Sequence, residues 1–306
     1  MDPTQLDAPP IEPRLFALAD ESRAFYAARG TGRGPQSAAE VLRLREQRMA
    51  DPRPRDQRAV DLTAEWAGRA VTLRVITPQI SARGVVLDLH GGGFYLGSAA
   101  DHDSWNRALS DALDAVVVGV DYRLAPEHPW PAAPDDCELA ARWLIANAAA
   151  EFGTDRLVLL GFSAGSTLAM TTLLRLRETG LAHRFRGAAL QFGTYDLSAT
   201  PPAGRLIADE YFLKAYVGHV DDRTVPDISP LFGAPTELPP TLLVVGSEDV
   251  LLDDNVAMAQ HLSRAGTDVA LRVYPASPHG FTHHPTSMAE AARHDIGEWL
   301  AERLTA

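Results

Sequence analysis

Gly161-Phe162-Ser163-Ala164-Gly165 directly follows the apolar run Leu157-Val158-Leu159-Leu160, and the two stretches together predict a strand, a tight turn and a helix. A Gly-x-Ser-x-Gly pentapeptide in this setting is typical of a nucleophile elbow. Its glycines let the backbone pass close to its neighbours, so the turn presents the hydroxyl of Ser163 above the sheet. The following helix, expected from about 164 to 177, directs its first amide N–H groups to where an oxyanion would form.

Continuous apolar runs recur along the chain and alternate with helical stretches. Such runs suit strands that are covered on both faces, and their alternation with helices indicates a mostly parallel sheet. Two runs with a period of two, near 60–66 and 71–75, predict an antiparallel pair at the start of this sheet. We therefore expect an α/β fold with a mostly parallel central sheet flanked by helices. The other expected strands are 85–89, 115–120, 157–160, 187–192, 242–245 and 269–273.

Two regions depart from this alternation. Residues 11–50 show helical periodicity in two pieces, and residues 196–238 mix aromatic residues with prolines and show no clear period. Both regions are expected to lie over the carboxyl edge of the sheet, where open α/β folds bind their ligands. A last helix is expected from about 287 to 303.

Composition excludes several classes of protein. The net charge of −12 over 306 residues argues against a surface for nucleic acid or anionic membranes. No stretch approaches the roughly 18 apolar residues of a membrane span, and the N-terminus lacks the pattern of a signal peptide. Cys137 is the single cysteine, so neither an intrachain disulfide nor a thiolate zinc cluster can form. We expect a cytoplasmic protein that binds neither nucleic acid nor membrane.

Three side chains that could perform acyl transfer follow strands in the order serine, acid, histidine. After Ser163 comes Asp249, just past the strand that ends near residue 245, and then His279, past the strand that ends near residue 274. All three positions are at carboxyl ends of strands, so the side chains are expected to converge. Glu248 and Asp253 compete with Asp249 as the acid. Asp253 or Asp254 is more simply expected to cap a helix that begins near Asn255.

The stretch His90-Gly91-Gly92-Gly93-Phe94 comes directly after an expected strand. Three glycines allow amide N–H groups to turn inward without a clashing Cβ. With the amide of Ala164 they would form an oxyanion hole. A plain turn or a phosphate cradle is the alternative, but no Lys-Ser/Thr pair follows. His90 is expected to anchor the loop.

The neighbours His283 and His284 could suggest a metal site. No His-Glu-x-x-His helix accompanies them, and the single cysteine offers no thiolate cluster. We interpret both histidines as loop or surface groups and expect no metal.

These motifs resemble those of the hormone-sensitive-lipase-like esterases, also called bacterial esterase family IV. Besides the two glycine-containing motifs, the segment 121–133 (DYRLAPEHPWPAA) and His279-Gly280-Phe281 are similar to that family's pattern, and the resemblance covers roughly residues 70–300. The resemblance implies an α/β-hydrolase fold that uses no cofactor and hydrolyses short- to medium-chain acyl esters. Many members of the family are dimers, so the resemblance also implies a homodimer as one assembly that this chain could form. It also implies a helical cap, so we interpret 1–55 as the N-terminal cap segment and 56–306 as the catalytic domain, with 196–238 as a cap insertion.

Carried onto this sequence, the resemblance implies Ser163 as nucleophile, Asp249 as acid and His279 as base. It implies the amides of Gly91, Gly92, Gly93 and Ala164 as the oxyanion hole. The aromatic residues that could line the substrate pocket are Phe94, Tyr95, Phe162, Tyr211 and Phe212.

Three positions depart from the family pattern. Phe162 stands where an Asp is usual, Ser166 replaces a Gly, and Val250 replaces a Pro. These departures bear on specificity more than on activity. Two alternatives stay open: the same three side chains could hydrolyse amides, formamides or lactones, or the chain could be a ligand receptor without catalysis.

Overall fold

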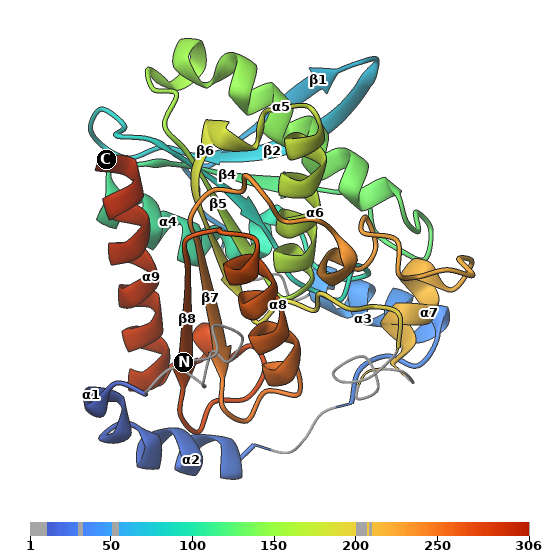
Figure 1. Cartoon of the computed structure of the whole chain (residues 1–306), viewed down its shortest axis with the longest axis vertical. Coiled ribbons are helices and arrows are strands. Elements are labelled where there is room, and N and C mark those ends of the chain that lie inside the picture. Colours follow the sequence, from blue (N-terminus) through green and yellow to red (C-terminus); the bar gives the residue numbers. More distant parts are fainter. Residues whose placement is uncertain (1–10, 30–32, 51–54, 200–206, 208–209, 306) are drawn as a thin grey trace.

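The computed structural model of the chain describes residues 11–29, 33–50, 55–199, 207 and 210–305. Its strands are β1 (Val60–Trp66), β2 (Arg69–Ile76), β3 (Val85–Leu89), β4 (Val116–Asp121), β5 (Leu157–Phe162), β6 (Phe185–Gln191), β7 (Thr241–Gly246) and β8 (Val269–Tyr274). They form one sheet in the order β1-β2-β4-β3-β5-β6-β7-β8 (Figure 1). The pairs β1–β2 and β2–β4 are antiparallel and the other neighbours are parallel. The predicted fold class, with its mostly parallel sheet, is confirmed.

The helices of the described residues cover both faces of the sheet. They are α1 (Pro13–Phe16), α2 (Ala19–Ala27), α3 (Ala38–Ala50), α4 (Asp103–Leu113), α5 (Ala132–Phe152), α6 (Ala164–Glu178), α7 (Tyr211–Val217), α8 (Leu252–Arg264) and α9 (Ser287–Thr305). Short 3₁₀ helices are η1 (Ala99–His102), η2 (Ala182–Arg184), η4 (Pro230–Phe232) and η5 (Phe281–His283). None of the helices in the described ranges has the length and apolarity that crossing a membrane requires.

Two hydrophobic cores form because side chains alternate along each strand. Val85, Leu87 and Leu89 of β3 contribute to the cluster that also contains residues of α5, α6 and α8. Val86, between them, contributes to a second cluster with α4 and α9. Figure 1 shows α6 and α9 on opposite sides of the sheet. Strands that are buried on both faces show no polar alternation, which is why they appear in the sequence as continuous apolar runs.

The N-terminal helices lie at the carboxyl ends of the strands. Ser22 of α2 donates its hydroxyl to the carbonyl oxygen of Ala276, just past β8, at 2.5 Å. Arg45 of α3 donates to the carbonyl oxygens of Tyr95 at 2.7 Å and Ala125 at 2.6 Å. Residues 1–10, 30–32 and 51–54 of the expected cap segment, and 200–206 and 208–209 of the expected insertion, lie outside the described residues. The division into a cap and a catalytic domain stays a prediction.

Candidate active site

Ser163 occupies the turn between β5 and α6 with an unusual backbone conformation. Its φ is 54° and its ψ is −118°, a region that non-glycine residues rarely adopt. The turn is held by a hydrogen bond from the Ser163 amide to the carbonyl oxygen of Gln191 at 2.9 Å. Two residues on, a Cβ built on Gly165 would lie 1.9 Å from the carbonyl oxygen of Leu89, so a glycine is required there. Such strain commonly marks a functional position.

Ser163, His279 and Asp249 form one continuous chain of contacts. Ser163 Oγ lies 2.8 Å from His279 Nε2. His279 Nδ1 lies 3.0 Å and 3.2 Å from the two carboxylate oxygens of Asp249. Because Nδ1 faces an acceptor, it carries the proton, and Nε2 is left to accept the hydroxyl proton of the serine. This is the arrangement that activates a serine as nucleophile.

The rival acids do not reach this histidine. Glu248 and Asp253 are exposed, whereas Asp249 is buried. Asp249 also accepts a hydrogen bond from the amide of Leu251 at 2.9 Å, which orients its carboxylate.

The expected start of the helix near Asn255 was wrong. α8 begins at Leu252, so Asp253 and Asp254 lie inside its first turn and neither caps it. The reason is that Asp249 closes the preceding turn: its carbonyl oxygen accepts from the Leu252 amide at 3.0 Å, which lets the chain enter the helix earlier.

The glycine loop after β3 leaves amide groups available beside Ser163. Gly92 and Gly93 have φ values of 127° and 59°, and a Cβ on Gly92 would lie 2.0 Å from the carbonyl oxygen of Leu96. No acceptor among the described residues pairs with the amide of either glycine. Ala164, the first residue of α6, also has a free helical N–H by position. These amides can stabilise a developing oxyanion.

His90 anchors this glycine loop, as the sequence indicated. Its Nδ1 lies 2.8 Å from the carbonyl oxygen of Gly91, and its ring stacks on Tyr122 with centroids 4.1 Å apart. The Tyr122 hydroxyl donates to the His90 carbonyl oxygen at 2.7 Å. Burial lowers the pKa of His90 to about 4, so the ring is neutral at physiological pH.

A cavity of about 520 Å³ opens beside Ser163 and His279. Of the five aromatic residues expected at the pocket, Phe94, Phe162 and Phe212 line it. Tyr95 and Tyr211 lie outside this lining; their ring centroids are 6.3 Å apart, and Tyr95 is buried. The lining also includes Val250, one of the departures from the family pattern, and four residues that the sequence did not indicate: Thr194, Ile207, Glu210 and Leu251. Val250 and Leu251 could have been found from their place next to Asp249.

Phe162 builds an aromatic wall at the position where the resemblance implies an Asp. Its ring stacks on His283, with centroids 3.9 Å apart, and packs edge-on against Phe192 at 4.7 Å. Phe192 in turn contacts the ring of His279 at 5.0 Å. The wall therefore supports the histidine by packing.

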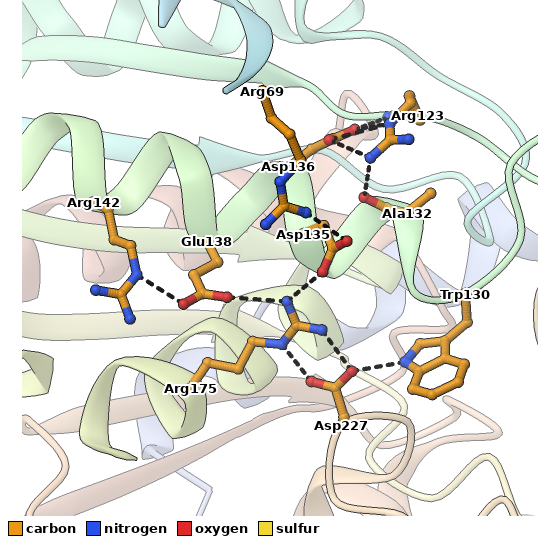
Figure 2. A network of polar contacts seen from close by, with 10 residues as sticks. All are labelled: Arg69, Arg123, Trp130, Ala132, Asp135, Asp136, Glu138, Arg142, Arg175 and Asp227. Carbon is orange, nitrogen blue, oxygen red and sulfur yellow. Dashed lines mark hydrogen bonds and ion pairs between the residues drawn. The ribbon is translucent and has the colours of Figure 1, made fainter. Parts of the chain in front are cut away.

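A network of charged groups fixes α6 to its surroundings (Figure 2). The guanidinium of Arg175 binds both carboxylate oxygens of Asp227, at 2.5 Å and 2.7 Å, and contacts Asp135 and Glu138 of α5 at 2.9 Å and 3.1 Å. The indole of Trp130 donates to Asp227 at 2.8 Å. The helix that begins at the elbow is thereby tied to α5 and to residues of the expected insertion.

The described residues contain no group of three or more His, Cys, Asp or Glu side chains placed to hold a metal ion. His284 contacts the hydroxyl of Tyr26 at 2.9 Å, and His283 packs on Phe162. Ser163, His279 and the amides line the cavity, and the buried Asp249 contacts His279 from behind; together they are the set that acyl transfer requires.

Comparisons with known proteins agree with this geometry. Residues 86–283 match the sequence profile of the α/β hydrolase fold. The chain is 31% identical over 303 residues to the carboxylesterase NlhH of Mycobacterium tuberculosis, covering 93% of this chain and 92% of that protein. An esterase structure from Pyrobaculum calidifontis aligns with a TM-score of 0.81 and 28% identity, over 97% of this chain and 100% of that one. A hormone-sensitive lipase structure from a metagenome library aligns with a TM-score of 0.75 and 28% identity, over 96% and 99%.

Proposed function

This chain belongs to the α/β-hydrolase family and, within it, to the hormone-sensitive-lipase-like esterases, which hydrolyse carboxylic esters; we propose that Ser163 is its nucleophile. The observation that carries the proposal is the unbroken line of contacts from Ser163 through His279 to Asp249. Its Ser163 end lies beside the amides of Gly92 and Gly93, which have no acceptor among the described residues. We assign Asp249 the role of acid and His279 that of base.

In the first half of the reaction, Ser163 Oγ attacks the ester carbonyl carbon while His279 Nε2 takes the hydroxyl proton. The carbonyl π electrons move to oxygen, and the amides of Gly91, Gly92, Gly93 and Ala164 stabilise the oxyanion. One such donor typically contributes about 3 kcal/mol to lowering the barrier. The C–O bond to the alcohol then breaks, and the imidazolium gives its proton to the leaving oxygen.

In the second half, water attacks the acyl-enzyme. His279 takes a proton from the water, the same amides hold the second oxyanion, and the C–O bond to Ser163 breaks with return of the proton to Oγ. Asp249 is buried and accepts from Nδ1 throughout, which stabilises the imidazolium in both halves.

The size and chemistry of the cavity support small substrates. A volume of about 520 Å³ lined largely by aromatic and aliphatic side chains suits short- to medium-chain acyl groups. A rate profile over p-nitrophenyl esters of graded acyl length tests this, with a matched amide and a lactone alongside. Faster turnover of the amide or the lactone than of any ester would favour the alternative reactions of the same side chains.

Replacement of Ser163 by alanine tests the nucleophile directly. We expect Ser163→Ala to lose at least about 1,000-fold in kcat on p-nitrophenyl butyrate, because no other group forms the acyl-enzyme. It should also lose labelling by a fluorophosphonate probe, while circular dichroism stays that of the parent. Ser104→Ala, on the exposed side of α4, is the matched control and keeps both properties. Turnover at the parental rate in Ser163→Ala would refute the assignment.

Two finer expectations remain proposals. A cytoplasmic location is supported by the single, buried Cys137, because secreted proteins commonly carry disulfides. A homodimer is implied by the family resemblance. Fractionation of the native host measures the location, and sedimentation at several protein concentrations measures the oligomeric state.

A further inference from the structure

The substrate cavity carries an uneven distribution of charge. Apart from His279, the only ionisable side chain in its described lining is Glu210. The rest of the wall is apolar or weakly polar, and three of its members are phenylalanines. A carboxylate in such a wall imposes a sign on the electrostatic potential that a substrate meets.

Glu210 is held at a fixed place by the backbone. It directly precedes α7, and its amide donates to the carbonyl oxygen of Ile207 at 3.0 Å. Its carboxylate forms no ion pair with any described residue, including Lys214 one turn further along α7. The residue is exposed and lines the cavity, so its charge is accessible to a ligand there.

The negative charge of Glu210 acts on its neighbours. Gly34 packs against both Tyr95 and Glu210, since a Cβ built on it would lie 3.4 Å from Tyr95 Oη and 3.7 Å from Glu210 Oε2. Burial, with a contribution from the Glu210 carboxylate, raises the pKa of Tyr95 to about 12.

An aromatic ring borders the same space. Phe94 is fully buried and its ring is stacked on Tyr216, whereas Phe212, two residues from Glu210, is only partly buried and lines the cavity. The face of an aromatic ring is electronegative and attracts an organic cation. A carboxylate beside aromatic rings is a combination that recognises an ammonium group and repels a carboxylate.

We propose that Glu210 and Phe212 form a cation subsite within the substrate cavity, so that esters bearing an ammonium group are preferred and esters bearing a carboxylate are disfavoured. This subsite rests on the proposed function of the same cavity. Because Glu210 is exposed, solvent screens its charge, and we expect a preference of about 3- to 10-fold over a neutral ester of the same shape. Raising the salt concentration should weaken it.

Three p-nitrophenyl esters of nearly equal length test the subsite. Their acyl groups are trimethylammonio-butyrate, its neutral isostere with a tert-butyl end, and glutarate as the monoester. The expected order of kcat/KM in the parent protein is cationic, then neutral, then anionic. In Glu210→Gln we expect the cationic-to-neutral and neutral-to-anionic ratios to fall toward one, since only the ring of Phe212 remains. A second series with the charge in the alcohol part shows on which side of the ester the subsite lies.

The controls separate the subsite from the reaction itself. Glu151→Gln removes one negative charge at the far end of α5, where the side chain is exposed, and should leave both ratios unchanged. Ratios in Glu210→Gln that equal those of the parent, or equal rates for the three esters in the parent, would overturn the subsite while leaving the esterase assignment intact. No Ser163-dependent turnover of the neutral ester would instead overturn the proposed function, and the subsite with it.

Discussion

Gly92 shows how much the chemistry depends on one missing side chain. Its φ of 127° is strained for any other residue, and an added Cβ would lie 2.0 Å from the carbonyl oxygen of Leu96. We predict that Gly92→Ala shifts the loop and lowers kcat by about 100-fold or more, because at least one oxyanion donor leaves its position. Steady-state kinetics on p-nitrophenyl butyrate measures the loss.

The matched control for this variant is Gly68→Ala, since Gly68 also has a positive φ, of 76°, but lies in the β1–β2 turn with no atom within 4 Å of an added Cβ. Gly68→Ala should introduce backbone strain without a steric clash, so we expect a modest loss of stability and an unchanged kcat. An equal loss of kcat in both variants would show that general destabilisation, and not donor geometry, explains the effect.

At the scale of elements, Arg175 joins three pieces of chain. It faces Asp227, Asp135 and Glu138 while its own side chain is only 18% exposed. We predict that Arg175→Met lowers the free energy of unfolding by about 3–5 kcal/mol, because three carboxylates then lie together with their main cation gone. Urea denaturation measures this.

For comparison, Arg23→Met removes an exposed ion pair with Asp20, within α2, and should cost less than about 1 kcal/mol. Similar losses in the two variants would mean that the Arg175 network contributes no more than an ordinary surface pair.

The ionisation of Asp254, in the first turn of α8, makes the free energy of unfolding depend on pH. Burial raises its pKa to about 7 from 3.8, and its carboxylate accepts hydrogen bonds from the amides of Tyr195 and Asp196. Thr194 and Asp196 are the polar groups that face it from the neighbouring segment. Because the pKa of Asp254 is higher in the folded than in the unfolded protein, the folded state holds the proton more tightly. The contribution of Asp254 to the free energy of unfolding therefore falls as the pH rises from about 4 to 7.

We predict that Asp254→Asn, which keeps the neutral form, gains thermal stability relative to the parent as the pH rises. The difference in Tm between variant and parent should increase between pH 4 and pH 8, corresponding to at most about 4 kcal/mol. Differential scanning calorimetry follows it. A Tm difference that stays constant over this range would contradict the raised pKa.

The same elements show what a sequence can and cannot reveal. β3, β5 and β7 were predictable because burial on both faces leaves continuous apolar runs, and the loops that hold Ser163 and Asp249 follow β5 and β7. His279 follows β8, which is only partly buried. The start of α8 was predicted three residues late because the closing turn at Asp249 depends on hydrogen bonds that no periodicity encodes.

At the scale of the whole molecule, the pocket was the least predictable part. Ile207 and Glu210 reach the cavity from a region without periodicity, whose position is set by distant contacts. One of these is the stacking of Tyr216 of α7 on Phe94, with centroids 4.0 Å apart. Segments far apart in the chain define such a surface together, so no local pattern records it.

The separation of the interior into two cores has a consequence for how the molecule opens. β3 pairs with β4 and β5, and β5 pairs with β3 and β6, so each strand has a hydrogen-bonded neighbour on both sides; every residue of β3 is also buried. Deuterium can therefore reach them only when the layers on both sides separate together. The amides of α2, at the periphery with few buried residues, should take up deuterium through local fraying. Mass spectrometry of deuterium-labelled peptides would thus rank the segments of the chain by their exchange rates. We expect β5, the strand before Ser163, to be among the slowest.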